Sequence, residues 1–155
     1  MSGTRTIYLS GPITGLSYEE AKLGWREELR ATLEALPLEV NIILLSPMRK
    51  KEYLEGSAKL SGEDGNWRAV MSRDFSDIDR ADLVVINLNN SCRVSIGTMV
   101  EIGYAKKAGK PMLLIMDAQE INAHDHGWVY NVVDAWVDDM AGAIDFIVNF
   151  CSEGL

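Results

Sequence analysis

The strongest constraint on the fold is the apolar run at residues 82–88, which reads Asp-Leu-Val-Val-Ile-Asn-Leu. A strand with one face in water alternates apolar and polar residues, whereas a strand in a parallel sheet covered by helices on both faces is apolar almost throughout. The run at residues 40–45 has the same character. Both segments are therefore predicted to be strands that are covered on both faces.

Segments with helical spacing separate these strands. From Ser17, the expected N-cap, apolar residues recur at helical intervals up to residue 36, with Glu20 as the capping-box partner and Pro37 as the stop. The same reasoning predicts strands at residues 6–10, 111–116 and within 132–137, and helices at residues 67–80, 97–108 and 139–150. Strand and helix thus alternate, which predicts an α/β fold with a doubly wound, mainly parallel sheet of about five strands and helices on both faces, flavodoxin-like or Rossmann-like.

Length and charge limit the classes of function. A chain of 155 residues suits one domain, and no linker or repeat divides residues 1–155. The formal net charge of −8 disfavours nucleic-acid polymers as partners, and no apolar stretch approaches the roughly 20 residues that cross a bilayer. This charge is easier to reconcile with a small-molecule ligand. The N-terminus has no signal-peptide pattern, and the two cysteines are far apart, so we expect a cytoplasmic protein.

Ligands of doubly wound sheets bind outside the carboxyl ends of the strands, so the loops at that edge are the most informative. After the first strand, Gly11 and Gly15 allow the backbone to approach a ligand closely, although neither a dinucleotide fingerprint nor a Walker lysine follows. A tight turn from strand to helix would explain the same glycines. The polar loop at residues 46–66 is long enough to be functional or mobile.

Glu101 is the candidate with the strongest support from the residues themselves. It lies near the start of the helix at residues 97–108, where Ser95 or Thr98 can cap the helix and Gly97 permits a sharp entry. The helix dipole there favours the ionised carboxylate, which is the form required of a nucleophile. A carboxylate that only complements the dipole is the structural alternative. However, the small and apolar neighbours of Glu101 predict a buried position, and a buried carboxylate needs a reason.

Two further groups of polar residues deserve a prediction. Asp74 adjoins the apolar stripe of the helix at residues 67–80 and could point over the sheet toward the site, whereas Asp77 is expected on a solvated face. His124 and His126 suggest a metal site, but no further Cys/His cluster accompanies them, so we predict no metal.

Three segments of the chain resemble the nucleoside 2-deoxyribosyltransferase family. They are residues 8–13 (Tyr-Leu-Ser-Gly-Pro-Ile), Asp74 with residues 81–85 (Ala-Asp-Leu-Val-Val), and residues 97–111, where Gly-Thr-x-x-Glu-Ile-Gly-Tyr-Ala precedes Gly-Lys-Pro. Their order and spacing agree with the family over residues 6–116, and a weaker match extends to residue 137. The 2'-deoxynucleoside 5'-monophosphate N-hydrolases are related to this family.

The resemblance implies a doubly wound domain that cleaves the N-glycosidic bond of a 2'-deoxynucleoside and transfers the sugar to another base. By the matching motifs, Glu101 would be the nucleophile, Asp74 the proton donor to the departing base, and Tyr8 a catalytic neighbour of the nucleophile. The residues that would bind the substrate are Ser10, Gly11, Ile13, Ser95, Gly97 and Thr98. Asn131 would complete the site of a neighbouring subunit, which implies a homo-oligomer with shared active sites, and no cofactor or metal is required.

One position departs from the transferase pattern and leaves the substrate open. Many transferases carry an aspartate six residues before the nucleophile, whereas this chain has Ser95, which suits a phosphate at a helix N-terminus better. The monophosphate N-hydrolases share the serine but carry an arginine in the first loop, where this chain has Thr14. Arg93 or residues 49–51 would then have to supply the charge. Three hypotheses stay open: deoxyribosyl transfer, hydrolysis of a deoxynucleoside 5'-monophosphate, and nucleotide sensing without catalysis.

Overall fold

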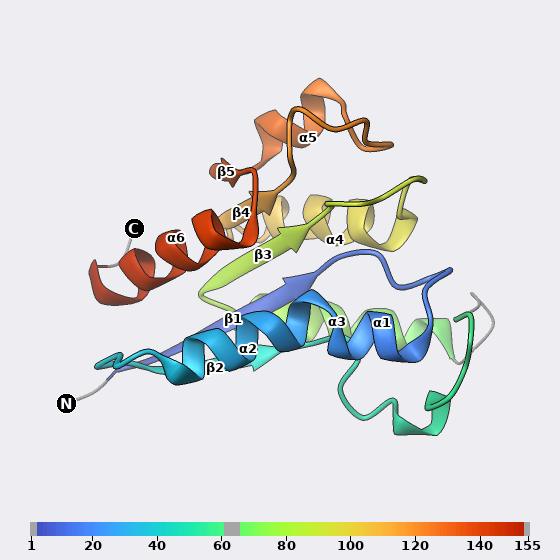
Figure 1. Ribbon diagram of the computed structural model, residues 1–155, viewed down its shortest axis with the longest axis horizontal. Helices are drawn as coiled ribbons and strands as arrows, with labels where there is room; N and C mark the ends of the chain where they lie inside the picture. Colours follow the sequence, from blue (N-terminus) through green and yellow to red (C-terminus); the bar gives the residue numbers. More distant parts are fainter. Residues whose placement is uncertain (1–2, 61–65, 154–155) are drawn as a thin grey trace.

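The computed structural model describes residues 3–60 and 66–153 and contains a five-stranded sheet in which all strands are parallel (Figure 1). The strands are β1 Thr4–Ser10, β2 Asn41–Leu45, β3 Leu83–Asn87, β4 Met112–Ile115 and β5 Ala135–Val137. Their order in the sheet is β2-β1-β3-β4-β5. This is the flavodoxin-like order, so the predicted α/β class and the predicted number of strands are confirmed.

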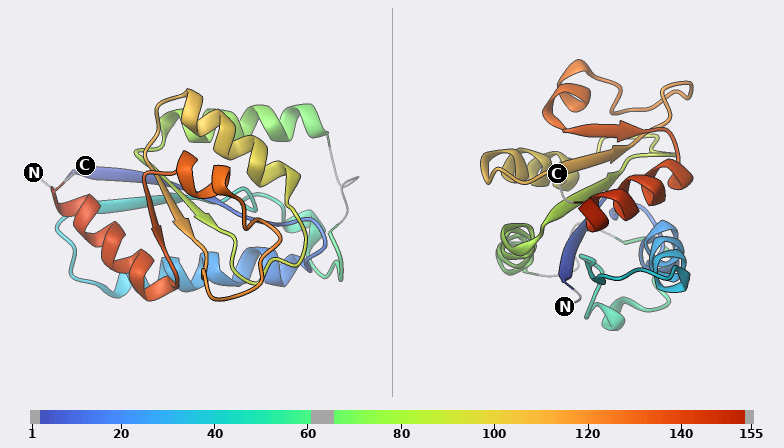
Figure 2. Two further views of the ribbon diagram at one scale, coloured as in Figure 1. Left: turned by 90° about the horizontal axis from the view of Figure 1, so that it is seen from above. Right: turned by 90° about the vertical axis from the view of Figure 1, so that its left-hand side faces the viewer.

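Helices cover both faces of the sheet (Figure 2). They are α1 Tyr18–Leu23, α2 Trp25–Ala35, α3 Trp67–Arg80, α4 Ile96–Lys107, α5 Gly127–Val132 and α6 Met140–Glu153, with a 3-10 turn, η1, at Glu52–Leu54. Helices α2 and α6 lie on one face, and α3 and α4 lie on the other. Among the helices of residues 3–60 and 66–153, none combines the length and apolarity needed to cross a bilayer.

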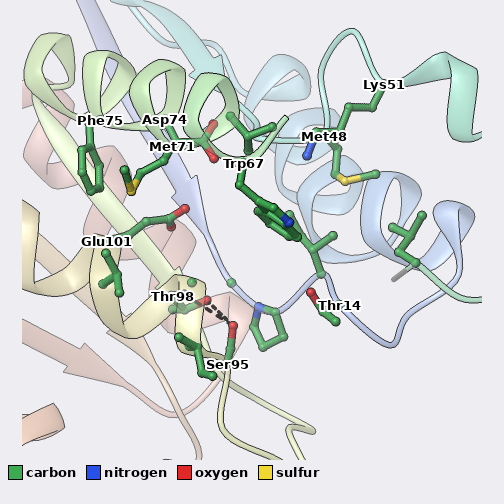
Figure 3. A pocket seen from close by; sticks show the side chains of 18 of the residues that line it. Thr14, Met48, Lys51, Trp67, Met71, Asp74, Phe75, Ser95, Thr98 and Glu101 are labelled. Atoms are coloured by element: carbon green, nitrogen blue, oxygen red, sulfur yellow. Dashed lines mark hydrogen bonds between the residues drawn. The ribbon is translucent and has the colours of Figure 1, made fainter. Parts of the chain in front are cut away.

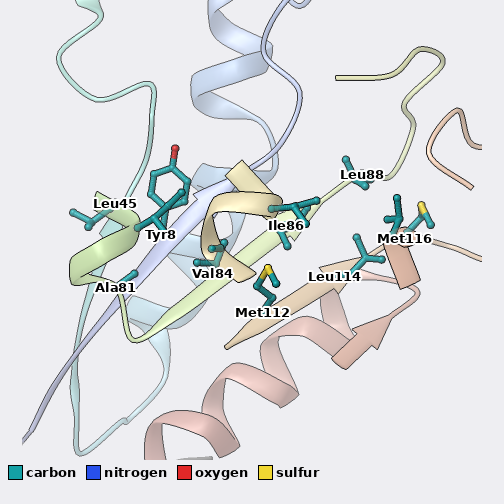
Figure 4. Packing of buried hydrophobic residues seen from close by; sticks show 13 residues of the cluster. Tyr8, Leu45, Ala81, Val84, Ile86, Leu88, Met112, Leu114 and Met116 are labelled. Atoms are coloured by element: carbon teal, nitrogen blue, oxygen red, sulfur yellow. The ribbon is translucent and has the colours of Figure 1, made fainter. Parts of the chain in front are cut away.

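The alternation of side chains along each strand divides the core into two layers. Val84 and Ile86 of β3 pack on the side of α3 and α4, in a cluster that also contains Tyr8 of β1 (Figure 4). Leu83 and Val85 pack on the opposite side, with residues of α2 and α6. All residues of β3 are buried, as the apolar run predicts for a strand covered on both faces.

The prediction that residues 40–45 are covered on both faces is wrong. Strand β2 is the edge of the sheet, where it pairs only with β1, and Ile43 is 43% exposed. Only Leu45, at its carboxyl end, is buried. An edge strand can be as apolar as a central one, so the sequence of the run does not distinguish the two positions.

The helix predicted from Ser17 to residue 36 is in fact two helices that meet at Gly24. Ser17 and Glu20 form the predicted capping box at the start of α1. A Cβ atom at Gly24 would lie 2.5 Å from the carbonyl oxygen of Glu20, so no side chain fits at this break. The short helix α5 is a further difference, because the sequence pattern predicts no helix there.

The long loop after β2 packs against the loop after β1. Leu60 and the first loop exchange two backbone hydrogen bonds: Gly15 N to Leu60 O (2.9 Å) and Leu60 N to Leu16 O (2.7 Å). The loop predicted at residues 46–66 therefore borders the carboxyl ends of the strands, although its residues 61–65 lie outside the described part of the chain.

The two strands at which the connections change direction, β1 and β3, are direct neighbours. Their carboxyl ends are so close that a Cβ atom at Gly11 would lie 2.9 Å from the carbonyl oxygen of Asn87. This edge is where ligands bind in sheets of this order.

Candidate active site

A cavity of about 800 Å³ opens at this edge of the sheet, between α3, α4 and the loops after β1 and β2 (Figure 3). A volume of this size is typical of a small-molecule site. Seven of the residues predicted for the site line it: Gly11, Ile13, Asp74, Ser95, Gly97, Thr98 and Glu101.

Glu101 reaches the wall of the cavity from the second turn of α4 (Figure 3). Its carboxylate accepts hydrogen bonds from the Tyr8 hydroxyl (Oη to Oε1, 3.0 Å) and from the Ser10 hydroxyl. The expectation that this stretch of helix is buried is correct only on one side, since Ile102 is buried while Val100 is 47% exposed. The side chain of Glu101 thus lies between the core and the cavity.

Burial is the main influence on the acidity of Glu101. It raises the pKa of the carboxyl to about 7, and the nearby charge of Asp74 adds to the effect, while the hydrogen bonds from Ser10 and Tyr8 oppose it. Burial and the two carboxylates also raise the pKa of Tyr8 well above its usual range, so its hydroxyl keeps its proton and acts as a donor. The carboxyl of Glu101 can therefore change its protonation state close to neutral pH.

Asp74 is the second carboxylate of the cavity and comes from α3. It is 7% exposed, and burial raises its pKa, while the adjacent guanidinium of Arg73 opposes this change. Arg73 donates to Asp74 Oδ1 from Nε (3.2 Å) and from Nη2 (3.0 Å), and Nη2 also donates to the carbonyl of Pro47 (2.7 Å). The position of Asp74 is thus tied to the loop after β2.

Ser95 and Thr98 form the N-terminus of α4 at the floor of the cavity. Ser95 is the N-cap, its Oγ accepting from Thr98 N (3.4 Å) and lying 2.9 Å from Thr98 Oγ1. The backbone N–H of Ser95 donates to Nε2 of His124 (2.8 Å), a buried histidine whose pKa is lowered by burial. His124 therefore supports the helix start.

No metal-binding group occurs in the described part of the chain. Within residues 3–60 and 66–153, no three His, Cys, Asp or Glu side chains come together in a way that could hold an ion. The two histidines that suggested a metal have different roles: His124 accepts a hydrogen bond from Ser95 N, and His126 caps α5.

An arginine from another loop, Arg93, contacts the loop after β1. Arg93, in the loop before α4, donates from Nη2 to the carbonyl of Thr14 (2.8 Å). Gly15 has a φ of +91°, and a Cβ atom there would collide with the guanidinium of Arg93. Gly15 therefore allows both the turn and the close approach of Arg93, which lines the cavity.

Three predicted residues do not line the cavity. Tyr8 and Ser10 are fully buried behind it and reach it only through Glu101. Asn131 lies on the exposed surface of α5, where its Nδ2 donates to the carbonyl of Gly127 (2.7 Å). The structure therefore does not bring Asn131 to the site of its own chain, and its role in a neighbouring subunit stays a prediction.

The sequence patterns missed several residues of this region. Trp67, Met71 and Phe75 line the cavity, and no motif distinguishes them from ordinary helix residues. Lys51, of the basic segment at residues 49–51 named above, lines the cavity as well. Arg26 is buried directly behind the first loop, although its spacing in α2 does not distinguish it from other arginines of that helix.

The prediction for Asp77 is wrong. Asp77 is 1% exposed and accepts hydrogen bonds from Arg49 (Nη2 to Oδ1, 2.8 Å) and Arg80 (Nη2 to Oδ1, 2.6 Å), so it is not on a solvated face. This ion pair attaches the loop after β2 to α3, next to Asp74.

Several solved structures share the fold of this chain. A 2-deoxyribosyltransferase from Bacillus psychrosaccharolyticus is 21% identical with a TM-score of 0.62, and the match covers 90% of each chain. A 2-desoxiribosyltransferase from Leishmania mexicana is 17% identical with a TM-score of 0.57, covering 97% of this chain and 99% of that one. A CMP N-glycosidase from Clostridium botulinum is 15% identical with a TM-score of 0.55, covering 92% of this chain and 98% of that one. These similarities establish the fold.

The family follows from the sequence itself. No curated protein matches the chain, but the family model described as nucleoside 2-deoxyribosyltransferase matches residues 7–133. The matched range contains both carboxylates of the cavity, Asp74 and Glu101, and the hydroxyl donors Tyr8 and Ser10. The chain therefore belongs to the nucleoside 2-deoxyribosyltransferase family, a family of enzymes that act on the N-glycosidic bond.

Proposed function

We propose that this enzyme cleaves the N-glycosidic bond of a 2'-deoxynucleoside through a covalent deoxyribosyl–Glu101 and passes the sugar to another base. The observation that carries the proposal is the Glu101 carboxylate, which faces the cavity while two hydroxyl donors hold it from behind. A second carboxylate, Asp74, enters the same cavity from α3 (Figure 3). Two carboxylates beside one glycosidic bond supply a nucleophile and a proton donor.

The reaction divides into two steps that mirror each other. In the first step an oxygen of Glu101 attacks the anomeric carbon, and the bond from that carbon to the base nitrogen breaks. The electron pair stays on the base, which takes a proton from Asp74. In the second step a nitrogen of the incoming base attacks the same carbon, Glu101 leaves as a carboxylate, and Asp74 recovers the proton from the incoming base.

The surroundings of each carboxyl suit these roles. The Tyr8 and Ser10 hydroxyls stabilise Glu101 as an anion and fix its orientation. Burial raises the pKa of Asp74 in spite of the opposing guanidinium of Arg73, and this direction favours the protonated form that a donor needs. The negative charge of Asp74 contributes to the raised pKa of Glu101, so the protonation states of the two carboxyls are expected to be linked.

The second candidate function is hydrolysis of a deoxynucleoside 5'-monophosphate, with water as the acceptor. The charges of the cavity favour it: apart from the two catalytic carboxylates, the charged side chains that line the described cavity are Lys51, Arg68 and Arg93. Arg93 donates a hydrogen bond to the carbonyl of Thr14, and Ser95 is the N-cap of α4, whose N-terminus borders the same cavity. This arrangement would accept a phosphate more readily than a cavity with a third carboxylate would.

One experiment separates these functions. The enzyme is incubated with deoxyinosine and adenine, and in parallel with a panel of deoxynucleoside 5'-monophosphates, while free base and new nucleoside are quantified by chromatography. Formation of deoxyadenosine supports transfer, and base release from monophosphates without release from nucleosides supports hydrolysis. In both cases Glu101→Gln is expected to lose turnover, whereas ligand binding without any base release would show a sensor and contradict both.

We further propose that the active enzyme is a homo-oligomer in which Asn131 completes a neighbour's site. Apolar side chains near the mouth of the cavity are exposed, among them Trp67 (58%) and Ile96 (78%), which suits a face that another subunit covers. The test mixes inactive Glu101→Gln with Asn131→Ala after mild dissociation and reassociation. Recovery of activity supports a shared site, and a fully active, monomeric Asn131→Ala contradicts it.

A further inference from the structure

A buried arginine lies behind the candidate site, on the opposite side of the sheet from Glu101. Arg26 is the second residue of α2, which packs on the face of the sheet opposite to α4, and it is only 3% exposed. Burying a guanidinium away from water costs free energy unless the surroundings compensate its charge. Arg26 therefore calls for an explanation.

The direct contacts of Arg26 explain only part of its burial. Its Nη1 donates to the carbonyl of Ala21 (2.9 Å), its Nη2 donates to the carbonyl of Gly11 (3.1 Å), and the guanidinium stacks 4.8 Å from the centre of the Trp25 ring. Its Nε is buried and has no hydrogen-bond partner. No ion pair with Arg26 occurs among the described residues, so two neutral carbonyls and an aromatic ring are the immediate neighbours of the charge.

The anions whose charge acts on Arg26 are the carboxylates of the candidate site. Burial lowers the pKa of Arg26 to about 10, while the negative charges of Glu101 and Asp74 act in the opposite direction. The guanidinium is therefore still charged at neutral pH. The effect is mutual, because Arg26 also favours the ionised form of Glu101.

Arg26 is connected to Glu101 through two consecutive residues at the end of β1. Ser10 donates its hydroxyl to Glu101, and the next residue, Gly11, gives its carbonyl to Arg26. Gly11 is also closely packed, since a Cβ atom there would lie 2.9 Å from the carbonyl oxygen of Asn87. A change in Arg26 is therefore expected to affect the adjacent Ser10, whose hydroxyl orients Glu101.

We propose that Arg26 is a positioning residue for the nucleophile: its guanidinium fixes the strand end that carries Ser10, and its buried positive charge is the counter-charge of the Glu101 carboxylate. The inference rests on the proposed role of Glu101. Arg26 does not line the cavity, so it acts through Ser10 and through its charge without contact to the substrate.

The charge component has a distinctive consequence for the pH dependence. The ionisable groups that act on Glu101 are Asp74 of α3, Tyr8 of β1 and Arg26 of α2. The ammonium group of Lys51 also interacts electrostatically with Glu101. Asp74 raises the pKa of Glu101, whereas Arg26 lowers it. Removing the charge of Arg26 must therefore raise the pKa of Glu101 and move the acidic limb of kcat/KM to higher pH.

The test compares Arg26→Met, which keeps much of the volume, with Arg26→Lys, which keeps the charge, and with Arg30→Met as a matched control. Arg30 lies on the same helix but pairs with Glu27 and Glu34 at the surface. For Arg26→Met we expect kcat/KM near pH 6 to fall at least about tenfold more than near pH 9, because each unit of increase in a pKa lowers the ionised fraction about tenfold at acidic pH. KM should change little, the acidic limb of Arg26→Lys should stay close to that of the wild type, and Arg30→Met should match the wild type.

A titration without turnover separates this inference from the proposed function. The wild type and Arg26→Met are labelled with ¹³C at the glutamate carboxyls, the resonance of Glu101 is assigned with Glu101→Gln, and its midpoint is followed by NMR. A higher midpoint in Arg26→Met supports the role of Arg26 as counter-charge even if the proposed reaction is wrong. If Glu101→Gln stays active, Glu101 is not the nucleophile, but the result of the titration still stands. An unchanged midpoint and an unchanged acidic limb in folded Arg26→Met overturn the inference. If that variant does not fold, Arg26→Gln, which keeps one N–H donor for Gly11 without the charge, gives the same two outcomes.

Discussion

The hydrogen bond from Tyr8 to Glu101 gives a prediction whose size can be worked out from the structure. Tyr8→Phe removes one hydroxyl from a ring that is fully buried in the core, so the ring keeps its packing. The lost contact is the 3.0 Å bond from Oη to Oε1, a bond to a charged group that contributes about 1.5–3 kcal/mol. Since this bond favours the ionised carboxylate, its loss raises the pKa of Glu101 from about 7.

The expected kinetic effect is largest on kcat/KM at low pH, because kcat/KM reports the ionisation of the free enzyme. A change of about 1.4 kcal/mol corresponds to about one pKa unit, so the acidic limb of kcat/KM should move upward by about one pH unit or more. At a pH of about 6.5 kcat/KM should then fall about tenfold or more, with a smaller loss at alkaline pH. KM should stay close to that of the wild type, because Tyr8 is fully buried and does not line the cavity.

The assay is base release measured over a range of pH, with Tyr104→Phe as the control. The Tyr104 hydroxyl also donates to a carboxylate, Asp79 (2.9 and 2.8 Å), but that pair is exposed and outside the cavity. Tyr104→Phe should therefore keep the wild-type profile. An unchanged kcat/KM and an unchanged acidic limb in Tyr8→Phe would refute the assignment of Tyr8 as a donor that supports an anionic Glu101.

Three further variants test other parts of the site. Asp74→Asn removes the proton donor and should slow base release about 10²–10⁴-fold, with the smallest loss for bases that depart most easily; equal losses for all bases in a leaving-group series would contradict this role. Gly11→Ala places a Cβ atom 2.9 Å from the Asn87 carbonyl and should lower the free energy of unfolding by about 1–3 kcal/mol. Urea denaturation measures this change, and an unchanged midpoint would show that the ends of β1 and β3 can separate. Arg93→Met should reduce base release from 5'-monophosphates while release from nucleosides is preserved, and equal losses on both substrates would mean that Arg93 only holds the Thr14 carbonyl.

The sequence was most informative where one local pattern determines the environment. The apolar run of β3 predicted a strand covered on both faces, and every residue of β3 is buried. The capping box at Ser17 and Glu20 was likewise predicted from four neighbouring residues and is present. Asp74 and Glu101 were selected from separate helices, and the structure brings both to one cavity.

The failures share a cause, which is that the decisive partner is distant in the sequence. Ile43 is exposed because β2 has a neighbour on one side only, and this depends on the order of the strands. Asp77 is buried because Arg49, from the loop after β2, pairs with it. Arg26 is compensated by the carboxylates of α3 and α4, and no periodicity within α2 reports their positions.

The most direct test of the central claim is mass spectrometry of the enzyme quenched during turnover. The account predicts a mass increase of one deoxyribosyl group, located by peptide mapping to Glu101 within α4 and absent from Glu101→Gln. Turnover without any adduct, with inversion at the anomeric carbon, or an adduct on a different residue, would contradict the role of Glu101 as the nucleophile.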